Sequence, residues 1–408
     1  MKILFFDYWL KGVGNFTRLA PIIEELYPGA ELKMLHTASW QLDNVDVEND
    51  HGLFKSFDSD FYGTSSLYRI LKKELPDVVV TLNNYFLLDK AVNIFCRKLG
   101  IKVIYLSHGR LGSKRLAFSL PSAKRNVKKL PKFNRMNRNM LWNYFLASLM
   151  EWKPQRFFTS VYKLFKKPAT MLTHSLYNDE LKTDGNLVYY KSCRDVLIDE
   201  RCFPSDEVKV MGNPELDDFI NAPTLSADDF YNKTGMTPGG YVLYMDDGTI
   251  QSGVLTEPDW KGHIKELNSM LKEQGLKLVI KFHPRTDVES LKQFITEEDI
   301  VPLNSNENLK GLVFYSHAII SLYSTTITYA LYMRKPVLSP RWGVTEHLER
   351  NYPDEDVRYI TTAKDFSDAV KTIENHPYEN SFYFDNCENF DGKSLQRIAS
   401  EIINVAAQ

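Results

Sequence analysis

The sequence predicts an α/β protein with two domains, each built on a largely parallel sheet. Short apolar runs rich in β-forming residues alternate with longer helical patterns along most of the chain, which is typical of repeated βαβ units. A polar stretch at 221–240, with Pro223, Pro238 and two adjacent glycines, separates two such series. The length of 408 residues allows two to three domains of about 150 residues each.

The first series begins with a strand at 2–9, and a glycine-containing turn and an amphipathic helix at 17–26 follow it. The further predicted strands of this series lie at 31–36, 77–82, 102–108, 171–175, 187–191 and 208–210. Between 111 and 168 the alternation stops, and we expect a largely helical insertion there. Together these segments predict a first, Rossmann-like domain at 1–225.

The second series follows the polar stretch. Its predicted strands lie at 241–245, 276–282, 300–303, 318–322, 336–339 and 357–360. These segments predict a second Rossmann-like domain at 241–390, and apolar periodicity at 394–406 predicts a closing helix within 391–408. Two such domains facing each other form a central cleft at the carboxyl ends of their strands, where open α/β sheets bind ligands.

Composition and charge exclude several classes of protein. Fifty Lys and Arg residues against 52 Asp and Glu leave a net charge of -2, so no global charge favours nucleic acid. No apolar run approaches the ~20 residues of a membrane span, and the N-terminus lacks the features of a secretory signal. The four cysteines form no C-x-x-C pair, so we expect neither a disulfide framework nor a structural metal. These features predict a cytoplasmic protein.

The first motif that carries chemistry is the strand at 241–245, which runs into Asp246, Asp247 and Gly248. Adjacent carboxylates at a strand end repel each other, which raises the pKa of one and favours a general base near neutral pH. An ordinary Asp-Gly turn has the same residues. We take Asp246 and Asp247 as candidate catalytic residues and Gly248 as a candidate phosphate contact.

The second motif, His283-Pro284-Arg285, also follows a predicted strand. Proline disfavours helical geometry in the residue before it, so His283 should lie extended at the carboxyl edge of the sheet. There its ring can contact a phosphate, and Lys281 and Arg285 add positive charge nearby. The alternative is a histidine that only binds a backbone carbonyl. We take His283 as a candidate catalytic residue, and Pro284 and Arg285 as candidate phosphate contacts.

The third motif is a buried strand at 318–322 with a cluster of hydroxyl side chains at its end. Ser321, Ser324, Thr325 and Thr326 form this cluster, and a predicted helix begins directly after it. Hydroxyls and the free backbone N–H groups of a helix N-terminus can bind an anion. Helix capping alone is the alternative. We take all four residues as candidate phosphate contacts.

In this order, the three motifs resemble those of the bacterial sialyltransferases and polysialyltransferases with the GT-B fold. The resemblance implies that Asp246 or Asp247 is the general base on the acceptor hydroxyl, and that His283 engages the phosphate of CMP-sialic acid. Ser324 and Thr325 would hold the same phosphate. It further implies an inverting, metal-independent glycosyltransferase that uses no cofactor beyond its CMP-sugar donor and builds a bacterial surface polysaccharide.

Other residues resemble related families. The triplet at 283–285, the Gly-Asn-Pro triplet at 212–214 and the stretch at 390–398 look like the CDP-glycerol glycerophosphotransferases and, more distantly, the UDP-GlcNAc 2-epimerases. These groups share the fold and a phosphate site in the second domain. A CDP-polyol phosphotransferase, a UDP-sugar transferase and a UDP-sugar 2-epimerase are therefore alternatives.

Further candidate residues lie in turns outside these motifs. Glu346 lies where GT-B enzymes place a carboxylate on the nucleotide ribose. In the first domain, glycines after the first strand let a ligand approach the backbone closely, although a plain turn has the same residues. The candidate acceptor-binding residues of this domain are Gly12, Gly14, Asn15, Arg18, His108 and Arg110. The first loop lacks the third glycine of a dinucleotide fingerprint, so we expect no redox cofactor.

The segment 122–168 is strongly basic, with twelve Lys and Arg residues, one acid and several aromatic side chains. This combination is typical of an interfacial helix on anionic lipid, and it also fits a groove for an anionic polysaccharide or a solvated helix face. We expect it to contact the inner membrane surface or the acceptor. The expected partners are thus a nucleotide-sugar donor, a glycan acceptor and an anionic membrane surface, without nucleic acid.

Overall fold

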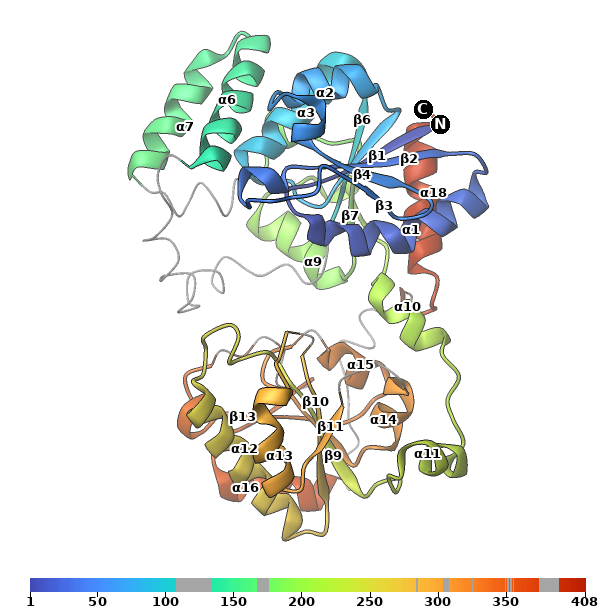
Figure 1. The fold of residues 1–408 in the computed structure, drawn as a ribbon, viewed down its shortest axis with the longest axis vertical. Coiled ribbons are helices and arrows are strands. Elements are labelled where there is room, and N and C mark those ends of the chain that lie inside the picture. Colours follow the sequence, from blue (N-terminus) through green and yellow to red (C-terminus); the bar gives the residue numbers. More distant parts are fainter. Residues whose placement is uncertain are drawn as a thin grey trace. The chain divides into compact units, whose positions relative to one another are not determined.

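The chain forms two compact units (Figure 1). The computed structural model describes residues 1–107, 134–166, 176–283, 285–303, 308–324, 326–348, 350, 352, 354, 356–373 and 389–408. Unit 1 comprises 1–214 and 393–408, and unit 2 comprises 215–392. Each unit is built on one sheet, which confirms the predicted class of an α/β protein with two parallel-sheet domains.

The described strands of unit 1 form an eight-stranded sheet in the order β3-β4-β2-β1-β5-β6-β7-β8. They are β1 (Lys2–Asp7), β2 (Glu31–His36), β3 (Glu48–Asp50), β4 (Lys55–Asp58), β5 (Val78–Thr81), β6 (Lys102–Leu106), β7 (Gly185–Val188) and β8 (Val208–Val210). All neighbours pair in parallel except β3 and β4. The sequence does not predict this hairpin, because β3 is a short, polar edge strand without an apolar run. The strand predicted at 171–175 lies outside the described residues.

The helices of unit 1 are α1 (Val13–Leu26), α2 (Leu67–Glu74), α3 (Leu87–Leu99), α6 (Arg135–Met150), α7 (Pro154–Lys166), α9 (Lys191–Asp195) and α18 (Ser394–Ala406). They cover its sheet directly or, in the case of α6 and α7, pack on α3 and on each other. In α1 the buried side chains recur every three or four residues, as expected for one face of an amphipathic helix. Phe16 of this face stacks on Phe5 of β1 at a ring distance of 4.3 Å, which joins the helix to the sheet.

The described strands of unit 2 form a six-stranded parallel sheet in the order β11-β10-β9-β12-β13-β14. They are β9 (Tyr241–Met245), β10 (Lys277–Lys281), β11 (Val301–Leu303), β12 (Ala318–Ile320), β13 (Val337–Pro340) and β14 (Arg358–Ile360). The helices are α10 (Pro214–Asn221), α11 (Ala227–Thr234), α12 (Glu257–Lys272), α13 (Lys292–Glu297), α14 (Leu309–Tyr315), α15 (Ile327–Tyr332) and α16 (Ala363–Thr372). Every residue of β9 is buried, as in a central parallel strand covered on both faces.

The boundary between the units lies earlier than the predicted position 225. Unit 1 ends at Pro214 because α10 packs on unit 2: the ring of Phe219 lies 4.6 Å from that of Tyr329. The closing helix α18 returns to unit 1, where it lies beside α1 (Figure 1). Arg397 of this helix donates to the backbone oxygen of Met211 at 2.8 Å. The predicted second domain at 241–390 thus gains α10 and α11 at its N-terminal side.

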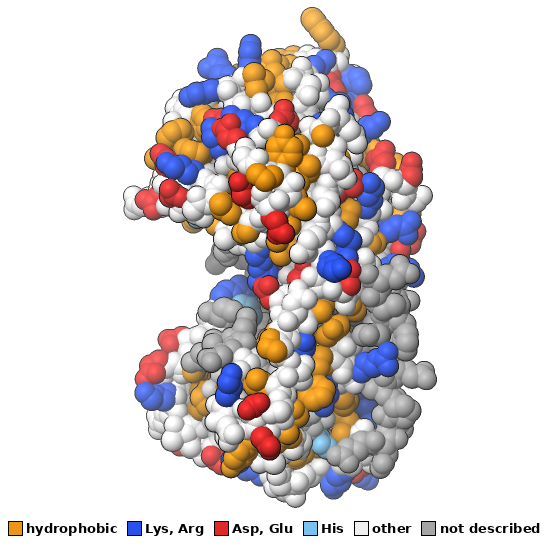
Figure 2. All heavy atoms as spheres, turned by 90° about the vertical axis from the view of Figure 1, so that its right-hand side faces the viewer, with side chains coloured by type: hydrophobic (Ala, Val, Ile, Leu, Met, Phe, Trp, Pro, Cys, Tyr) orange, Lys and Arg blue, Asp and Glu red, His pale blue; other side chains and the backbone are white. Residues whose placement is uncertain are grey.

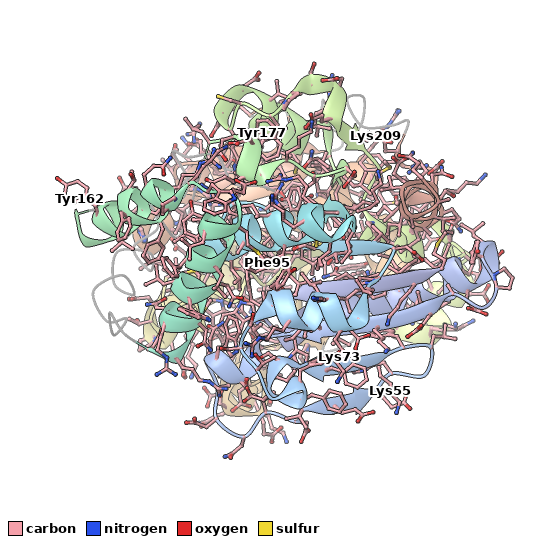
Figure 3. All side chains as sticks on the ribbon, turned by 90° about the horizontal axis from the view of Figure 1, so that it is seen from above. Lys55, Lys73, Phe95, Tyr162, Tyr177 and Lys209 are labelled. Atoms are coloured by element: carbon pink, nitrogen blue, oxygen red, sulfur yellow. The ribbon has the colours of Figure 1, made fainter. Side chains whose placement is uncertain are left out.

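The helices α6 and α7 lie within the segment predicted as a helical insertion, and they dock on unit 1 through a buried charge. Glu180 accepts hydrogen bonds from Tyr144 of α6 at 2.8 Å and from Lys90 of α3 at 3.2 Å. Arg156 of α7 lies 3.6 Å from the same carboxylate. Tyr144 also packs in the apolar core beside Phe95 of α3, which Figure 3 shows in the interior.

Basic side chains of this segment pair with acids from elsewhere in the chain. Arg135 pairs with Asp60, and Lys153 and Arg156 pair with Asp179 at 3.4 and 2.8 Å. The local excess of positive charge in the sequence is therefore partly neutralised in the fold. Figure 2 shows the side of the chain that faces away from α6 and α7, and there too Lys and Arg side chains lie among Asp and Glu. The parts of the segment at 122–133 and 167–168 lie outside the described residues.

Candidate functional site

The candidate residues of unit 2 lie at the carboxyl edge of its sheet. β9 pairs with β10 on one side and with β12 on the other, all in parallel. The described residues that follow these strands, at 246–248, 282–283, 285 and 321–324, therefore lie along one edge, which is where open α/β sheets bind ligands. The order of the strands explains why three motifs distant in the sequence come together.

The carboxylate of Asp246 points toward β10. It accepts hydrogen bonds from the backbone N–H of His283 at 3.1 Å and from the hydroxyl of Thr286 at 2.8 Å. Its second oxygen accepts from the backbone N–H of Gly248 at 3.1 Å. Asp246 is buried, so its three bonds fix the backbone of the histidine motif against the end of β9.

The carboxylate of Asp247 points the opposite way, toward β12. It accepts from the backbone N–H groups of Leu322 and Tyr323 at 2.9 and 2.8 Å, and from the Ser321 hydroxyl at 3.1 Å. Burial, with a smaller contribution from the charge of Asp246, raises the pKa of Asp247 to about 6, although these hydrogen bonds lower it. The expected perturbed pKa of one aspartate is therefore present, with burial as its main cause.

These contacts bear on the predicted roles of both aspartates. Each carboxylate is buried and accepts three hydrogen bonds from its own sheet edge, so the geometry makes Asp246 and Asp247 positioning residues. The general-base role stays a prediction. Ser321 is fully buried and donates to Asp247, so its hydroxyl serves the scaffold and not a ligand.

The imidazole of His283 is partly exposed and held in one tautomer. The backbone N–H of Arg285 donates to its Nδ1 at 3.1 Å, so in the neutral ring the proton lies on Nε2. Burial lowers the pKa of His283, and the charges of Arg285 and Lys281 lower it too, whereas Asp246 opposes them. The ring therefore presents an Nε2–H donor at neutral pH.

Gly248 is required next to this ring. Its φ is +64°, and a Cβ built on it would lie 3.1 Å from Cγ of His283. A side chain there would meet both a backbone conformation that L-residues disfavour and the imidazole. The glycine of the first motif thus sets the position of the histidine of the second.

The hydroxyl cluster after β12 is only partly described. Ser324 Oγ accepts from the backbone N–H and the hydroxyl of Thr326 at 3.2 and 2.9 Å, which leaves its own proton available for donation. The Tyr352 hydroxyl binds the Ser324 carbonyl at 3.1 Å. The helix α15 has only six residues, so its dipole adds less than the sequence predicted. Thr325 and Pro284 lie outside the described residues.

The remaining candidates of unit 2 are exposed. Arg285 lies directly after the histidine, and Glu346 follows the short helix η8 (Gly343–Thr345) beyond the end of β13. Their positions at the carboxyl side of the sheet are compatible with ligand contact. The structure assigns neither a partner at this site.

Sequence reasoning missed one buried cation behind the hydroxyl cluster. Arg341 follows β13, and its guanidinium donates to the backbone oxygens of Leu322 and Pro340 at 2.6 and 2.9 Å. Its charge also lies over the ring of Tyr359, 5.1 Å from the centroid. Burial lowers the pKa of Arg341, which Asp247 partly opposes. The only signal in the sequence was an arginine directly after a strand.

The candidates of unit 1 divide into described and undescribed residues. A Cβ on Gly12 would lie 2.6 Å from Oδ2 of Asp7, so close approach to a carboxylate, and not to a ligand, explains this glycine. Gly14 has open space around its Cα, and Arg18 is exposed. Asn15 is partly buried on α1. His108 and Arg110 lie outside the described residues.

The described residues offer neither a metal-binding cluster nor a membrane-spanning helix. Among these residues, no three His, Cys, Asp or Glu side chains come together in a way that could hold a metal ion. In the same part of the chain, each helix is too short or too polar to cross a bilayer.

Comparisons with known proteins identify the fold. No protein-family model and no curated protein matches the sequence. Among solved structures, the chain resembles the UDP-GlcNAc 2-epimerase of Methanocaldococcus jannaschii (15% identity, 99% of this chain and 100% of that chain, TM-score 0.53). It also resembles the UDP-GlcNAc 2-epimerase of Neisseria meningitidis bound to UDP-GlcNAc (16%, 99% and 100%, 0.53). A third match is the glycotransferase of kitacinnamycin (13%, 99% and 99%, 0.54). These likenesses show the GT-B type of fold.

Proposed function

We propose that the protein is a nucleotide-sugar enzyme of the GT-B type that uses a UDP-sugar and transfers its glycosyl group to a glycan acceptor. The observation that carries the proposal is the carboxyl edge of the unit 2 sheet, where His283 and Ser324 offer donors from the two loops that flank the end of β9. The solved structures that the chain resembles include an epimerase bound to UDP-GlcNAc and a glycotransferase. They support a uridine nucleotide over the CMP-sialic acid expected from the motifs.

The chemistry of the site fits a departing phosphate. Nε2–H of His283 and the hydroxyl of Ser324 are donors, and neither residue is fully buried. As the bond between the anomeric carbon and the diphosphate breaks, negative charge grows on the leaving oxygen. Donors that are already oriented stabilise such developing charge by a few kcal/mol each. Asp246 and Asp247 contribute by holding the two loops in place.

A thermal-unfolding assay with UDP, UDP-GlcNAc, CDP and CMP at equal concentrations tests the nucleotide. A ligand that binds only the folded state at about 100 times its Kd stabilises the protein by about 2.7 kcal/mol. We expect the largest rise in Tm with the uridine diphosphates. A larger rise with CMP would restore the sialyltransferase hypothesis, and a larger rise with CDP would favour the CDP-polyol phosphotransferase.

A UDP-sugar 2-epimerase is the second candidate, because two of the solved structures compared above are such enzymes. Proton NMR of UDP-GlcNAc incubated with the protein and no acceptor separates the two reactions. The transferase proposal predicts no epimerised sugar under these conditions. Appearance of UDP-ManNAc or free ManNAc would replace it by the epimerase.

We also propose that the α6–α7 hairpin contacts an anionic membrane surface, where glycan acceptors can be held. Its rings form a continuous series: Trp142 lies 5.9 Å from Phe145, Phe145 5.0 Å from Phe157, and Phe157 5.5 Å from Phe158. Trp142 and Phe158 are 49% and 62% exposed, and Figure 3 shows Tyr162 pointing outward at the end of α7. Exposed aromatic rings near Lys and Arg are typical of membrane interfaces.

Co-sedimentation with vesicles of phosphatidylglycerol and phosphatidylcholine tests this contact. We expect the wild type to pellet with the mixed vesicles and the double variant Trp142→Ser/Phe158→Ser to remain in solution. Tyr231→Ser, a change at a 53% exposed ring of unit 2, is the matched control and should pellet like the wild type. Equal pelleting of the double variant would refute the contact.

A further inference from the structure

Unit 1 contains a buried cation that has no counter-ion among the described residues. Arg201 follows η5 (Val196–Glu200) and is only 4% exposed. Its guanidinium lies over the ring of Tyr85, 5.1 Å from the centroid. Its Nη1 is buried without a hydrogen-bond partner. A buried charge is costly unless it is paired and hydrogen-bonded, so this arrangement requires an explanation.

The acids near Tyr85 are already engaged. Asp89 accepts from the hydroxyl of Tyr8 and from the backbone N–H groups of Tyr85 and Phe86 at 2.8 and 2.7 Å. Asp7 accepts from the backbone N–H of Tyr8 at 2.8 Å. No ion pair joins Arg201 to a carboxylate among the residues that the structure describes. The undescribed ranges of unit 1, at 108–133 and 167–175, contain no Asp or Glu in the sequence.

The position of Arg201 is that of a ligand contact. Tyr85 follows β5, so the guanidinium lies at the carboxyl edge of the unit 1 sheet, where open α/β sheets bind ligands. The backbone is fixed there: Tyr177 N–H donates to the Arg201 carbonyl at 2.8 Å. The next residue, Cys202, has a φ of +63°, a left-handed conformation that is strained for a residue other than glycine and is typical of functional sites.

We propose that Arg201 binds an oxyanion, a carboxylate or a phosphate, on the molecule that unit 1 accepts. Under the proposed function, on which this identification of the ligand rests, that molecule is the glycan acceptor, and the acceptor is then acidic. A guanidinium recognises carboxylate and phosphate through paired N–H donors. The aromatic face of Tyr85 holds the cation in the absence of ligand.

The first test measures stability without ligand. Arg201→Met keeps much of the side-chain volume and removes the charge. Because replacing an unpaired buried charge by an apolar side chain relieves its desolvation, we expect the variant to unfold at the same temperature as the wild type or higher. A structural arginine behaves in the opposite way, so a clearly lower Tm for Arg201→Met would overturn the proposal.

The second test measures anion binding at constant ionic strength. Glucuronate and inorganic phosphate are the two probes, with glucose as the neutral control. We expect at least one anion to bind the wild type, with a Kd that rises about tenfold or more in Arg201→Met and less in Arg201→Lys. A lower Kd for glucuronate than for phosphate would indicate a carboxylate site, and the opposite order would indicate a phosphate site. Binding to neither anion, or equal binding to the wild type and Arg201→Met, would refute the site.

His283→Ala separates this site from that of unit 2. The variant should keep the anion response of Arg201, and Arg201→Met should keep the binding of UDP. If UDP binds neither the wild type nor Arg201→Met while the anion response depends on Arg201, the proposed function fails and the oxyanion site stands. Loss of the anion response in His283→Ala alone would assign the anion to unit 2 and overturn the inference.

Discussion

Replacement of Gly248 by alanine separates backbone strain from contact with the histidine. At φ +64°, a residue with a Cβ destabilises the folded state by about 1–2 kcal/mol. The lower entropy of its unfolded chain offsets about 0.4–1 kcal/mol of this loss. The Cβ would also lie 3.1 Å from Cγ of His283, so the ring must move by a few tenths of an ångström. The two backbone effects leave a net loss of about 0–1.6 kcal/mol, so with the displaced ring we expect Gly248→Ala to lose up to about 2 kcal/mol of stability. It should bind UDP about 10-fold or more weakly, the value of one charge-assisted hydrogen bond.

Gly253 is the matched control for this change. It lies in the same loop with a φ of +68°, and no atom lies within 4 Å of a Cβ built on it. Gly253→Ala should therefore show the backbone cost alone in chemical denaturation, and calorimetric titration should find its UDP affinity unchanged. Equal UDP affinity in Gly248→Ala and Gly253→Ala would refute the role of the glycine in placing the imidazole.

Three further predictions concern buried charges. Asp246→Ala removes the acceptor of the His283 and Gly248 N–H groups, whereas the Thr286 hydroxyl keeps Gln251 Oε1. Urea unfolding should show a loss of about 2–5 kcal/mol together with weaker UDP binding; unchanged values of both would contradict the positioning role. Burial raises the pKa of Asp247 to about 6 in the folded state, above the value of about 4 in the unfolded chain. Asp247 therefore stabilises the fold fully below pH 4, and this contribution to the free energy of unfolding, up to about 3 kcal/mol, is lost as the pH rises through 6. Asp247→Asn should remove this part of the pH dependence. If the free energy of unfolding varies with pH in the same way in the variant and the wild type, the raised pKa of Asp247 is refuted. Glu180→Ala leaves the buried ammonium of Lys90 unpaired and should cost about 3–5 kcal/mol, which a denaturation curve coincident with the wild type would refute.

The sequence predicts the strands of unit 2 and the edge where they end, because buried parallel strands are continuous apolar runs. It predicts that residues 246–248 and 283 meet at that edge. It does not predict where the carboxylates point. Asp246 binds His283, 37 residues away, and Asp247 binds Leu322, 75 residues away. The order of the strands in the sheet decides which loop each carboxylate contacts.

The buried cations also escape sequence reasoning. Arg201 stands in no motif, and its significance depends on its lack of an ion pair with any carboxylate in the part of the chain that the structure describes. The basic residues of 134–166 show the opposite arrangement, in which a basic side chain is neutralised by a distant acid. Arg135 forms an ion pair with Asp60, 75 residues earlier in the chain. Local charge counts therefore overestimate the free positive charge of this segment.

Calorimetric titration of UDP into the wild type, His283→Ala and Ser324→Ala tests most directly whether the carboxyl edge of the unit 2 sheet holds a nucleotide diphosphate. Both variants should raise the Kd about 10-fold or more, while His347→Ala, a change at an exposed histidine of the same unit, should leave it unchanged. UDP binding of equal strength in all four proteins, or no binding to the wild type, would contradict the account.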